Sequence, residues 1–229
     1  MEHSKERPIG ILMLDSNIPR PAGDIGNKDT FPFPVIHKTV KNATISNVIL
    51  AKASYEELLQ PFLQAAKELQ EEGCSAITTS CGFLAAYQEV LAAAVSIPVF
   101  TSSLLQIPMA YAMTGRTVGI LASSTAVEPL VKNMAQGIPT ALKGMDDSVC
   151  FAAMKTKHPY YDQSVMKQEV LTAVGALIHE HPEIGSLVIE CANLPPYAKA
   201  IQDTYGLPVF DIVTLTNFVQ NVTHCMTFS

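Results

Sequence analysis

Two cysteines each follow a short apolar stretch of the chain. Cys81 comes after residues 75–79, and Cys191 comes after residues 186–189. Such stretches are typical of buried parallel strands, and ligands in open α/β folds bind just beyond the carboxyl ends of these strands. We therefore expect both cysteines at strand ends, facing each other across one cleft.

Two matched thiols suit proton transfer at a carbon acid. To invert a stereocentre, a base on one face removes the α-proton and an acid on the other face returns one. We expect Cys81 and Cys191 to form this pair without a metal or cofactor, with sulfurs roughly 6–10 Å apart so that a carbon fits between them. A lone buried cysteine is more often a small apolar core residue, the role we assign to Cys74, Cys150 and Cys225.

Small or polar residues at the same strand ends are candidates for substrate binding. Helix starts there carry unpaired backbone N–H groups, which favour a carboxylate ligand and the thiolate form of a cysteine. The candidates are Asp15, Ser16, Asn17, Ser80, Gly82, Phe83, Ser123, Ser124, Thr125, Ala192 and Asn193. We expect the hydroxyl groups of residues 123–125, with backbone N–H groups near Gly82 and Ala192, to hold a carboxylate. Phe83 either contacts an apolar part of the substrate or belongs to the core.

Residues 16–34 form a long loop after the first expected strand. The loop holds four prolines and two glycines, and ordered loops of this length are often lids or binding loops. It is either a lid that closes over the cleft or a stiff surface excursion. Glu190 also has two interpretations, since it could tune the neighbouring thiol from beyond the strand end or contact the other half of the chain.

These residues are positioned by an order of elements that occurs twice. The first half has expected strands at 9–14, 35–40, 75–79 and 97–100 and expected helices at 55–72, 83–94 and 104–113. The second half has expected strands at 117–122, 186–189 and 207–210 and expected helices at 126–136, 162–180 and 212–225. The repeat predicts an α/β fold of two pseudosymmetric flavodoxin-like lobes, each a mostly parallel sheet flanked by helices. Residues 1–114 plus 211–229 are expected to form one lobe, and 115–210 the other.

Composition narrows the class of protein. The 229 residues are 48% hydrophobic and 16% charged, which suits a globular protein with a sizeable core, and the net charge of −6 argues against nucleic acid and anionic membranes. Residues 90–113 carry no charge, but Pro98 and Pro108 make a buried strand–turn–helix a better interpretation than a membrane helix. No signal peptide is recognised, and five cysteines without CxxC spacing indicate a reducing, cytoplasmic location.

Other signals are weaker. His179 and His181 end an expected helix, and the six histidines show no ligand spacing with the cysteines, so no metal site is predicted. The low charge of residues 73–115 fits either the subunit interface of a homo-oligomer or a core between the lobes.

The motifs together resemble a known family. Asp15-Ser16, Thr79-Ser80-Cys81-Gly82 and Glu190-Cys191-Ala192-Asn193 are similar, in their joint order, to the aspartate/glutamate/hydantoin racemase superfamily over residues 9–211. The resemblance implies two lobes, an active site between them, and a cofactor-independent cysteine pair. Glutamate racemases carry Asn-Thr and Thr-His after their two cysteines, so Gly82-Phe83 and Ala192-Asn193 argue against glutamate as the substrate.

We therefore predict an isomerase that racemises a small carboxylate-bearing substrate, an amino acid such as aspartate or glutamate or a hydantoin. The alternatives are a single-thiol decarboxylase or cis–trans isomerase of the same superfamily, and a two-lobed protein that binds a small molecule without turnover. A decarboxylase needs one thiol and a binding protein needs neither, so the presence of two matched thiols favours the racemase over both alternatives. A thiol redox protein is disfavoured because no resolving CxxC is present.

Overall fold

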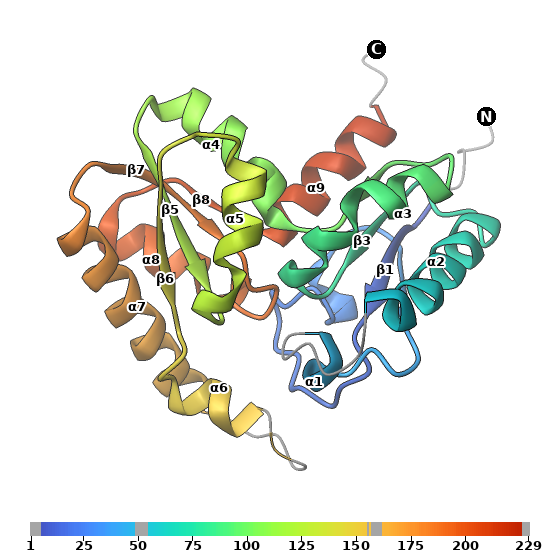
Figure 1. Cartoon of the computed structure of the whole chain (residues 1–229), viewed down its shortest axis with the longest axis horizontal. Helices are drawn as coiled ribbons and strands as arrows, with labels where there is room; N and C mark the ends of the chain where they lie inside the picture. Colours follow the sequence, from blue (N-terminus) through green and yellow to red (C-terminus); the bar gives the residue numbers. More distant parts are fainter. Residues whose placement is uncertain (1–5, 49–54, 155, 157–161, 226–229) are drawn as a thin grey trace.

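The computed structural model describes residues 6–48, 55–154, 156 and 162–225. Two four-stranded parallel sheets lie side by side (Figure 1). The first sheet, in the order β2-β1-β3-β4, consists of β1 (Ile9–Met13), β2 (Val35–Thr39), β3 (Ala76–Thr79) and β4 (Val99–Phe100). The second, in the order β6-β5-β7-β8, consists of β5 (Thr117–Ala122), β6 (Thr140–Gly144), β7 (Ile184–Ile189) and β8 (Val209–Phe210). The two orders are equivalent, which confirms the predicted pair of flavodoxin-like α/β lobes.

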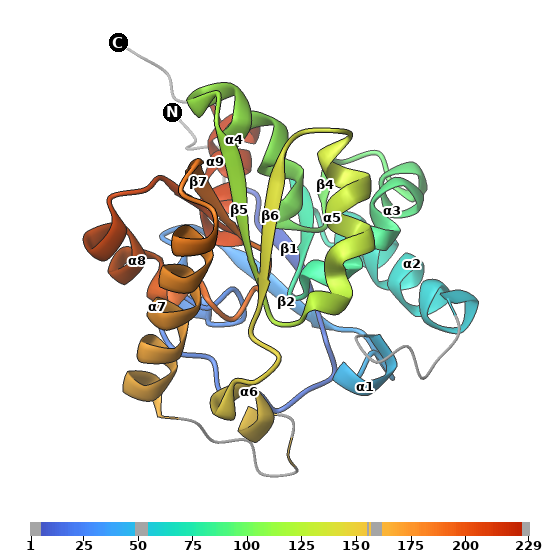
Figure 2. The ribbon, with the colours of Figure 1, turned by 60° about the vertical axis from the view of Figure 1, so that its left-hand side comes forward.

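Helices cover both sheets. The first half contains α1 (Ile45–Val48), α2 (Tyr55–Glu71), α3 (Gln88–Ala94) and α4 (Ile107–Thr114). The second half contains α5 (Glu128–Ala135), α6 (Val149–Met154), α7 (Gln163–Glu180), α8 (Ala198–Tyr205) and α9 (Ile212–Thr223). Short 3-10 helices are Lys28–Thr30, Gly82–Tyr87, Ser103–Gln106, Thr125–Val127 and Pro195–Tyr197. Figure 2 shows α1 and α6 at the same end of the molecule. No helix of the described ranges is long and apolar enough to cross a bilayer.

Two helices tie the lobes together. Ile107 and Ala110 of α4 belong to a core cluster with Val118 and Val188 of the second sheet. Ile212 of α9, in turn, belongs to a cluster with residues of β1 in the first sheet. Each sheet is thus covered in part by the helix that follows the last strand of the other sheet. The division into residues 1–114 plus 211–229 and 115–210 stays a prediction.

Some expected elements differ from the structure. Residues 83–94, predicted as one helix, form the 3-10 segment Gly82–Tyr87 followed by α3. The sequence did not reveal β6, because Ala141 is its only fully buried residue and the strand lacks an apolar run. It is an edge strand, with a neighbouring strand on one side only. It therefore lacks the continuous apolar sequence that is typical of central parallel strands.

The strand register places the two cysteines at equivalent positions. Leu12 of β1 pairs with Thr79 of β3, and Leu121 of β5 pairs with Ile189 of β7. Thr79 and Ile189 are the last residues of their strands. Each cysteine follows two residues later, at the carboxyl end of a central strand.

Candidate active site

One pocket lies at the carboxyl ends of both sheets. Its lining from the first half of the chain consists of Leu14, Ile18, Arg20, Ile45, Ser80, Cys81 and Gly82. The second half contributes Ser123, Ser124, Phe151, Met154, Glu190, Cys191, Ala192 and Asn193. The two cysteines therefore line one pocket from two different sheets, and each is only 7% exposed.

The structure brings together part of the predicted binding set. Ser80, Gly82, Ser123, Ser124, Ala192 and Asn193 line the pocket, whereas Asp15, Ser16, Asn17, Phe83 and Thr125 are absent from its described lining. The side chains of Asp15 and Asn17 are exposed. Phe83 packs against the apolar core clusters of the two sheets, which is the core role considered for it above.

The helix start after β5 is already occupied by an acid. Asp146 accepts hydrogen bonds from the Ser124 hydroxyl at 2.6 Å and from the Thr125 N–H at 2.9 Å. Both bonds lower the pKa of Asp146 against the effect of its partial burial, so its carboxylate stays ionised. A substrate carboxylate at Thr125 would have to displace this side chain. Two of the donors expected to hold the substrate, the Ser124 hydroxyl and the Thr125 N–H, therefore already have a partner within the protein.

The loop 16–34 supplies a positive charge that the sequence prediction did not assign. Arg20 lines the pocket, and its Nη1 lies 3.1 Å from Oδ1 of Asp24, which is fully buried. Oδ2 of the same carboxylate accepts a hydrogen bond from Nδ2 of Asn193 at 2.7 Å. Asp24 thus connects Arg20 with the segment that carries Cys191.

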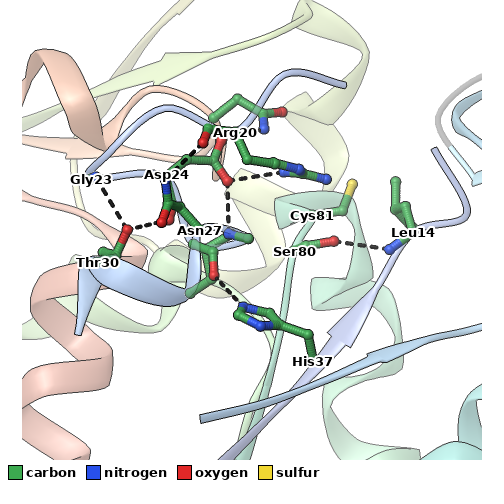
Figure 3. A network of polar contacts seen from close by, with 12 residues as sticks. Leu14, Arg20, Gly23, Asp24, Asn27, Thr30, His37, Ser80 and Cys81 are labelled. Carbon is green, nitrogen blue, oxygen red and sulfur yellow. Dashed lines mark hydrogen bonds and ion pairs between the residues drawn. The ribbon is translucent and has the colours of Figure 1, made fainter. Parts of the chain in front are cut away.

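Further contacts fix the path of this loop (Figure 3). Asn27 donates to the Arg20 carbonyl, and the Thr30 hydroxyl donates to the Asp24 carbonyl. Gly23 has a φ of +90° and lies against the backbone of Pro196, where an added Cβ would be 3.1 Å from Cα. The loop is therefore packed against the second lobe, next to the Cys191 segment.

Burial keeps both thiols protonated in the ligand-free pocket. Desolvation, reinforced by the nearby Glu190 carboxyl, raises the pKa of Cys81 to about 12 and that of Cys191 well above its ordinary value. Backbone N–H groups just after each cysteine lower the pKa of its thiol, as expected at the start of a helix, but the effect of burial is larger. At pH 7 the thiol form of Cys81 therefore dominates.

The surroundings of the two thiols are unequal. The Arg20 guanidinium lowers the pKa of Cys81, whereas the Asp24 carboxylate raises the pKa of Cys191. The Arg20 charge therefore favours ionisation of Cys81, and the Asp24 charge favours the protonated form of Cys191.

Glu190 is the one carboxyl group of the described pocket lining, and it is 1% exposed. Neither carboxylate oxygen has a hydrogen bond of normal geometry within the described part of the chain. Burial raises its pKa to about 7, and the backbone N–H of Ser123 only partly offsets this. The equivalent residue of the first lobe, Ser80, accepts a 2.9 Å hydrogen bond from the Leu14 N–H.

No group of three or more His, Cys, Asp or Glu side chains in the described ranges is arranged to hold a metal ion. The chemistry that these residues can perform is acid–base chemistry by two thiols and a carboxyl, with a guanidinium available for an anionic group of the ligand.

Two equivalent parallel sheets with a pocket across their carboxyl ends define a two-lobed α/β fold. Residues 33–216 match the family model described as Asp/Glu/Hydantoin racemase, and the chain belongs to this family. Arylmalonate decarboxylase has the same fold, with a TM-score of 0.62 and 13% identity over 95% of this chain and 94% of that one. Allantoin racemase from Klebsiella pneumoniae superposes with a TM-score of 0.64 and 14% identity over 93% and 86%.

Relatives with higher identity carry a different activity in their names. The dimethylsulfoniopropionate lyase of Durusdinium sp. clade D is 30% identical over 93% of this chain and 74% of its own length. Lyases of that name from Emiliania huxleyi are 23–29% identical, and the chain spans 45–71% of their length.

Proposed function

We propose that this chain is a lyase that removes a proton next to a carboxylate and expels a group from the neighbouring carbon, with dimethylsulfoniopropionate as its substrate. The observation that carries the proposal is a pocket lined by one thiol from each lobe, in a chain 30% identical to a lyase of that name. This replaces the isomerase as the leading hypothesis from the sequence.

The reaction balances without a cofactor. The substrate carries a carboxylate and a dimethylsulfonium group on adjacent carbons. A thiolate takes a proton from the carbon next to the carboxylate, and the electron pair of that C–H bond becomes the new C=C bond. The electron pair of the C–S bond leaves with sulfur. The products are acrylate, dimethyl sulfide and a protonated thiol.

The unequal surroundings assign the roles. Cys81 acts as the base because Arg20 lowers its pKa and no second carboxylate is among the groups that raise it. Cys191 stays protonated and donates a hydrogen bond to the charge that develops on the substrate carboxylate. Arg20, held by the buried Asp24, attracts that carboxylate at the same end of the pocket.

A racemase is the second candidate. The equivalent slots of Cys81 and Cys191, each two residues past a strand end, favour it, because inversion needs an acid and a base on opposite faces. Its substrate would be an amino acid or a hydantoin, as the sequence predicts. A single-thiol decarboxylase would share the fold but leave one cysteine without a role.

Two assays on the purified chain separate these candidates. Incubation with dimethylsulfoniopropionate, followed by proton NMR and gas chromatography, should show acrylate and dimethyl sulfide formed in equal amounts. Incubation with amino acids and hydantoins in D2O should show no α-deuteration. Deuteration of an amino acid or hydantoin without any release of dimethyl sulfide would replace the lyase by the racemase.

A further inference from the structure

Glu190 has a location that folding alone does not explain. Its two oxygens are buried, and the one donor that acts on them in the described ranges, the Ser123 N–H, makes no hydrogen bond of normal geometry. A buried polar group without such a bond is destabilising. The equivalent position in the other lobe holds a serine, whose hydroxyl is satisfied by the Leu14 N–H. A small hydroxyl therefore suffices to fill this slot, and the glutamate must serve another purpose.

The carboxyl lies between the two halves of the pocket. A Cβ placed on Gly82, next to Cys81, would be 2.2 Å from Oε1 of Glu190, so the acid rests directly on the backbone of the first lobe. Glu190 also acts electrostatically on both Cys81 and Cys191. A ligand that sits between the two thiols is therefore close to this carboxyl.

Among the described residues, no cation is available to pair with Glu190 inside the pocket. Arg20 is the one Arg or Lys of the described lining, and its guanidinium is already held by Asp24 at 3.1 Å. A lone buried carboxylate next to a small-molecule pocket has its charge compensated best by a cation on the ligand itself.

We propose that Glu190 is the counter-charge for a cationic centre of the ligand, so that this pocket selects carboxylates with a positive charge close to the reacting carbon. The proposal rests on the proposed function and deepens it, because it names the feature by which the substrate is recognised. The ligand carboxylate then lies toward Arg20, and its sulfonium or quaternary ammonium group lies toward Glu190.

Binding and activation are coupled in this arrangement. A cation between the thiols stabilises both the ionised carboxyl and a thiolate, each of which is disfavoured in the ligand-free pocket. The substrate thus brings the charge that its own deprotonation requires. A neutral ligand of the same shape cannot do this, and it is rejected without any steric clash.

The groups that titrate or carry charge near Glu190 determine the expected pH dependence. They are Cys81, Cys191, Arg20 and Asp24. Both thiols ionise far above pH 8, and the Arg20 and Asp24 charges oppose each other in an ion pair. Because burial raises the pKa of Glu190 to about 7, its negative charge develops between pH 6 and 8. Affinity for a permanent cation should therefore increase with pH in this range.

Two ligands that differ only in charge test the proposal by calorimetry. They are 3-(trimethylammonio)propanoate and its neutral analogue 4,4-dimethylpentanoate. At pH 8 the wild type should bind the cationic ligand at least about tenfold more tightly, and this preference should shrink at pH 6. Glu190→Gln should reduce the preference at least about tenfold, while Glu128→Gln, which removes an exposed charge paired with Lys132, should leave it unchanged.

The opposite results overturn the proposal. The wild type and Glu190→Gln would show the same preference for the cationic ligand, or the wild type would bind the neutral ligand more tightly, or the wild type would not bind the cationic ligand at all. Should the variant not fold, the wild type decides alone, since a preference that does not change between pH 6 and 8 contradicts a role for Glu190. These readouts are affinities, so they are independent of dimethyl sulfide release, on which the lyase proposal stands or falls.

Discussion

The two lobes carry a cysteine at the same strand end but surround it with different charges. In the first lobe, Ser80 precedes Cys81, and the Arg20 guanidinium lowers the pKa of that thiol. In the second lobe, Glu190 precedes Cys191. Glu190 raises the pKa of both thiols, whereas Asp24 raises only that of Cys191. A racemase works in both directions and benefits from two similar thiols, whereas an elimination needs one base. The difference between the lobes therefore favours the lyase over the racemase.

The largest expected effect comes from removing the proposed base. Cys81→Ser should reduce dimethyl sulfide release by about 10³-fold or more, because an alcohol is a far weaker base than a thiolate at neutral pH. Cys191→Ser should reduce it only about 10–100-fold, because a hydroxyl can still donate a hydrogen bond. Gas chromatography of both variants measures the difference. Equal losses of activity in the two variants would instead indicate two equivalent thiols, as a racemase needs.

A second prediction concerns Glu190 and stability. Folding raises the pKa of this acid from an ordinary 4.5 to about 7, so the folded state loses stability as pH rises between those values. Glu190→Gln, which has no charge, should therefore be about 3 kcal/mol more stable than the wild type at pH 8 and nearly equal to it at pH 4.5. Urea denaturation at several pH values measures this. A difference that does not depend on pH would mean that the carboxyl is ionised or solvated in both states.

The contact between Gly82 and Glu190 gives a third prediction. Gly82→Ala places a Cβ 2.2 Å from Oε1 of Glu190 and should cost about 1–3 kcal/mol of unfolding free energy. Glu190→Ser, which copies the residue of the first lobe, should recover part of this loss in the double variant, because the Glu190 carbonyl oxygen, 2.5 Å from the same Cβ, remains. Ala192, at the equivalent position of the second lobe, already carries a Cβ, so Ala192→Gly is the matched control. If the loss of unfolding free energy in the double variant equals the sum of the losses in the two single variants, the two residues do not interact.

The smallest effect is expected at Arg20. Arg20→Lys keeps the charge but loses the fixed fork of donors, so KM should rise about 5–10-fold while kcat changes little. Initial rates over a range of substrate concentrations separate the two constants. A fall in kcat at constant KM would place Arg20 in the chemical step instead of in carboxylate binding.

The sequence was sufficient to predict every strand of the two sheets except β6, together with the two strand ends that carry the cysteines. Apolar runs before Cys81 and Cys191 mark buried strands, and the repeated order of elements predicts two lobes. Residues 83–94 have the composition of one regular helix, whereas the structure begins this stretch with the 3-10 segment Gly82–Tyr87 directly after Cys81.

Most of the charges in the pocket depend on tertiary contacts. Arg20 is held at the pocket by Asp24, which in turn is bound by Asn193, 169 positions away in the sequence. Asp146, which follows the end of β6, accepts a hydrogen bond from the Thr125 N–H that the sequence left free for a ligand. The high pKa of each thiol comes from burial by both lobes, which no local pattern shows.

The division of labour between the thiols is tested most directly by the fate of one hydrogen. Dimethylsulfoniopropionate deuterated stereospecifically at the carbon next to the carboxylate exists in two forms, one for each face. If Cys81 alone is the base, one form yields acrylate that keeps its deuterium and the other yields acrylate without it, in the wild type and in Cys191→Ser alike. Mass spectrometry of the acrylate measures this. A mixture from each form, or a reversed selectivity in Cys191→Ser, would contradict a single base at Cys81.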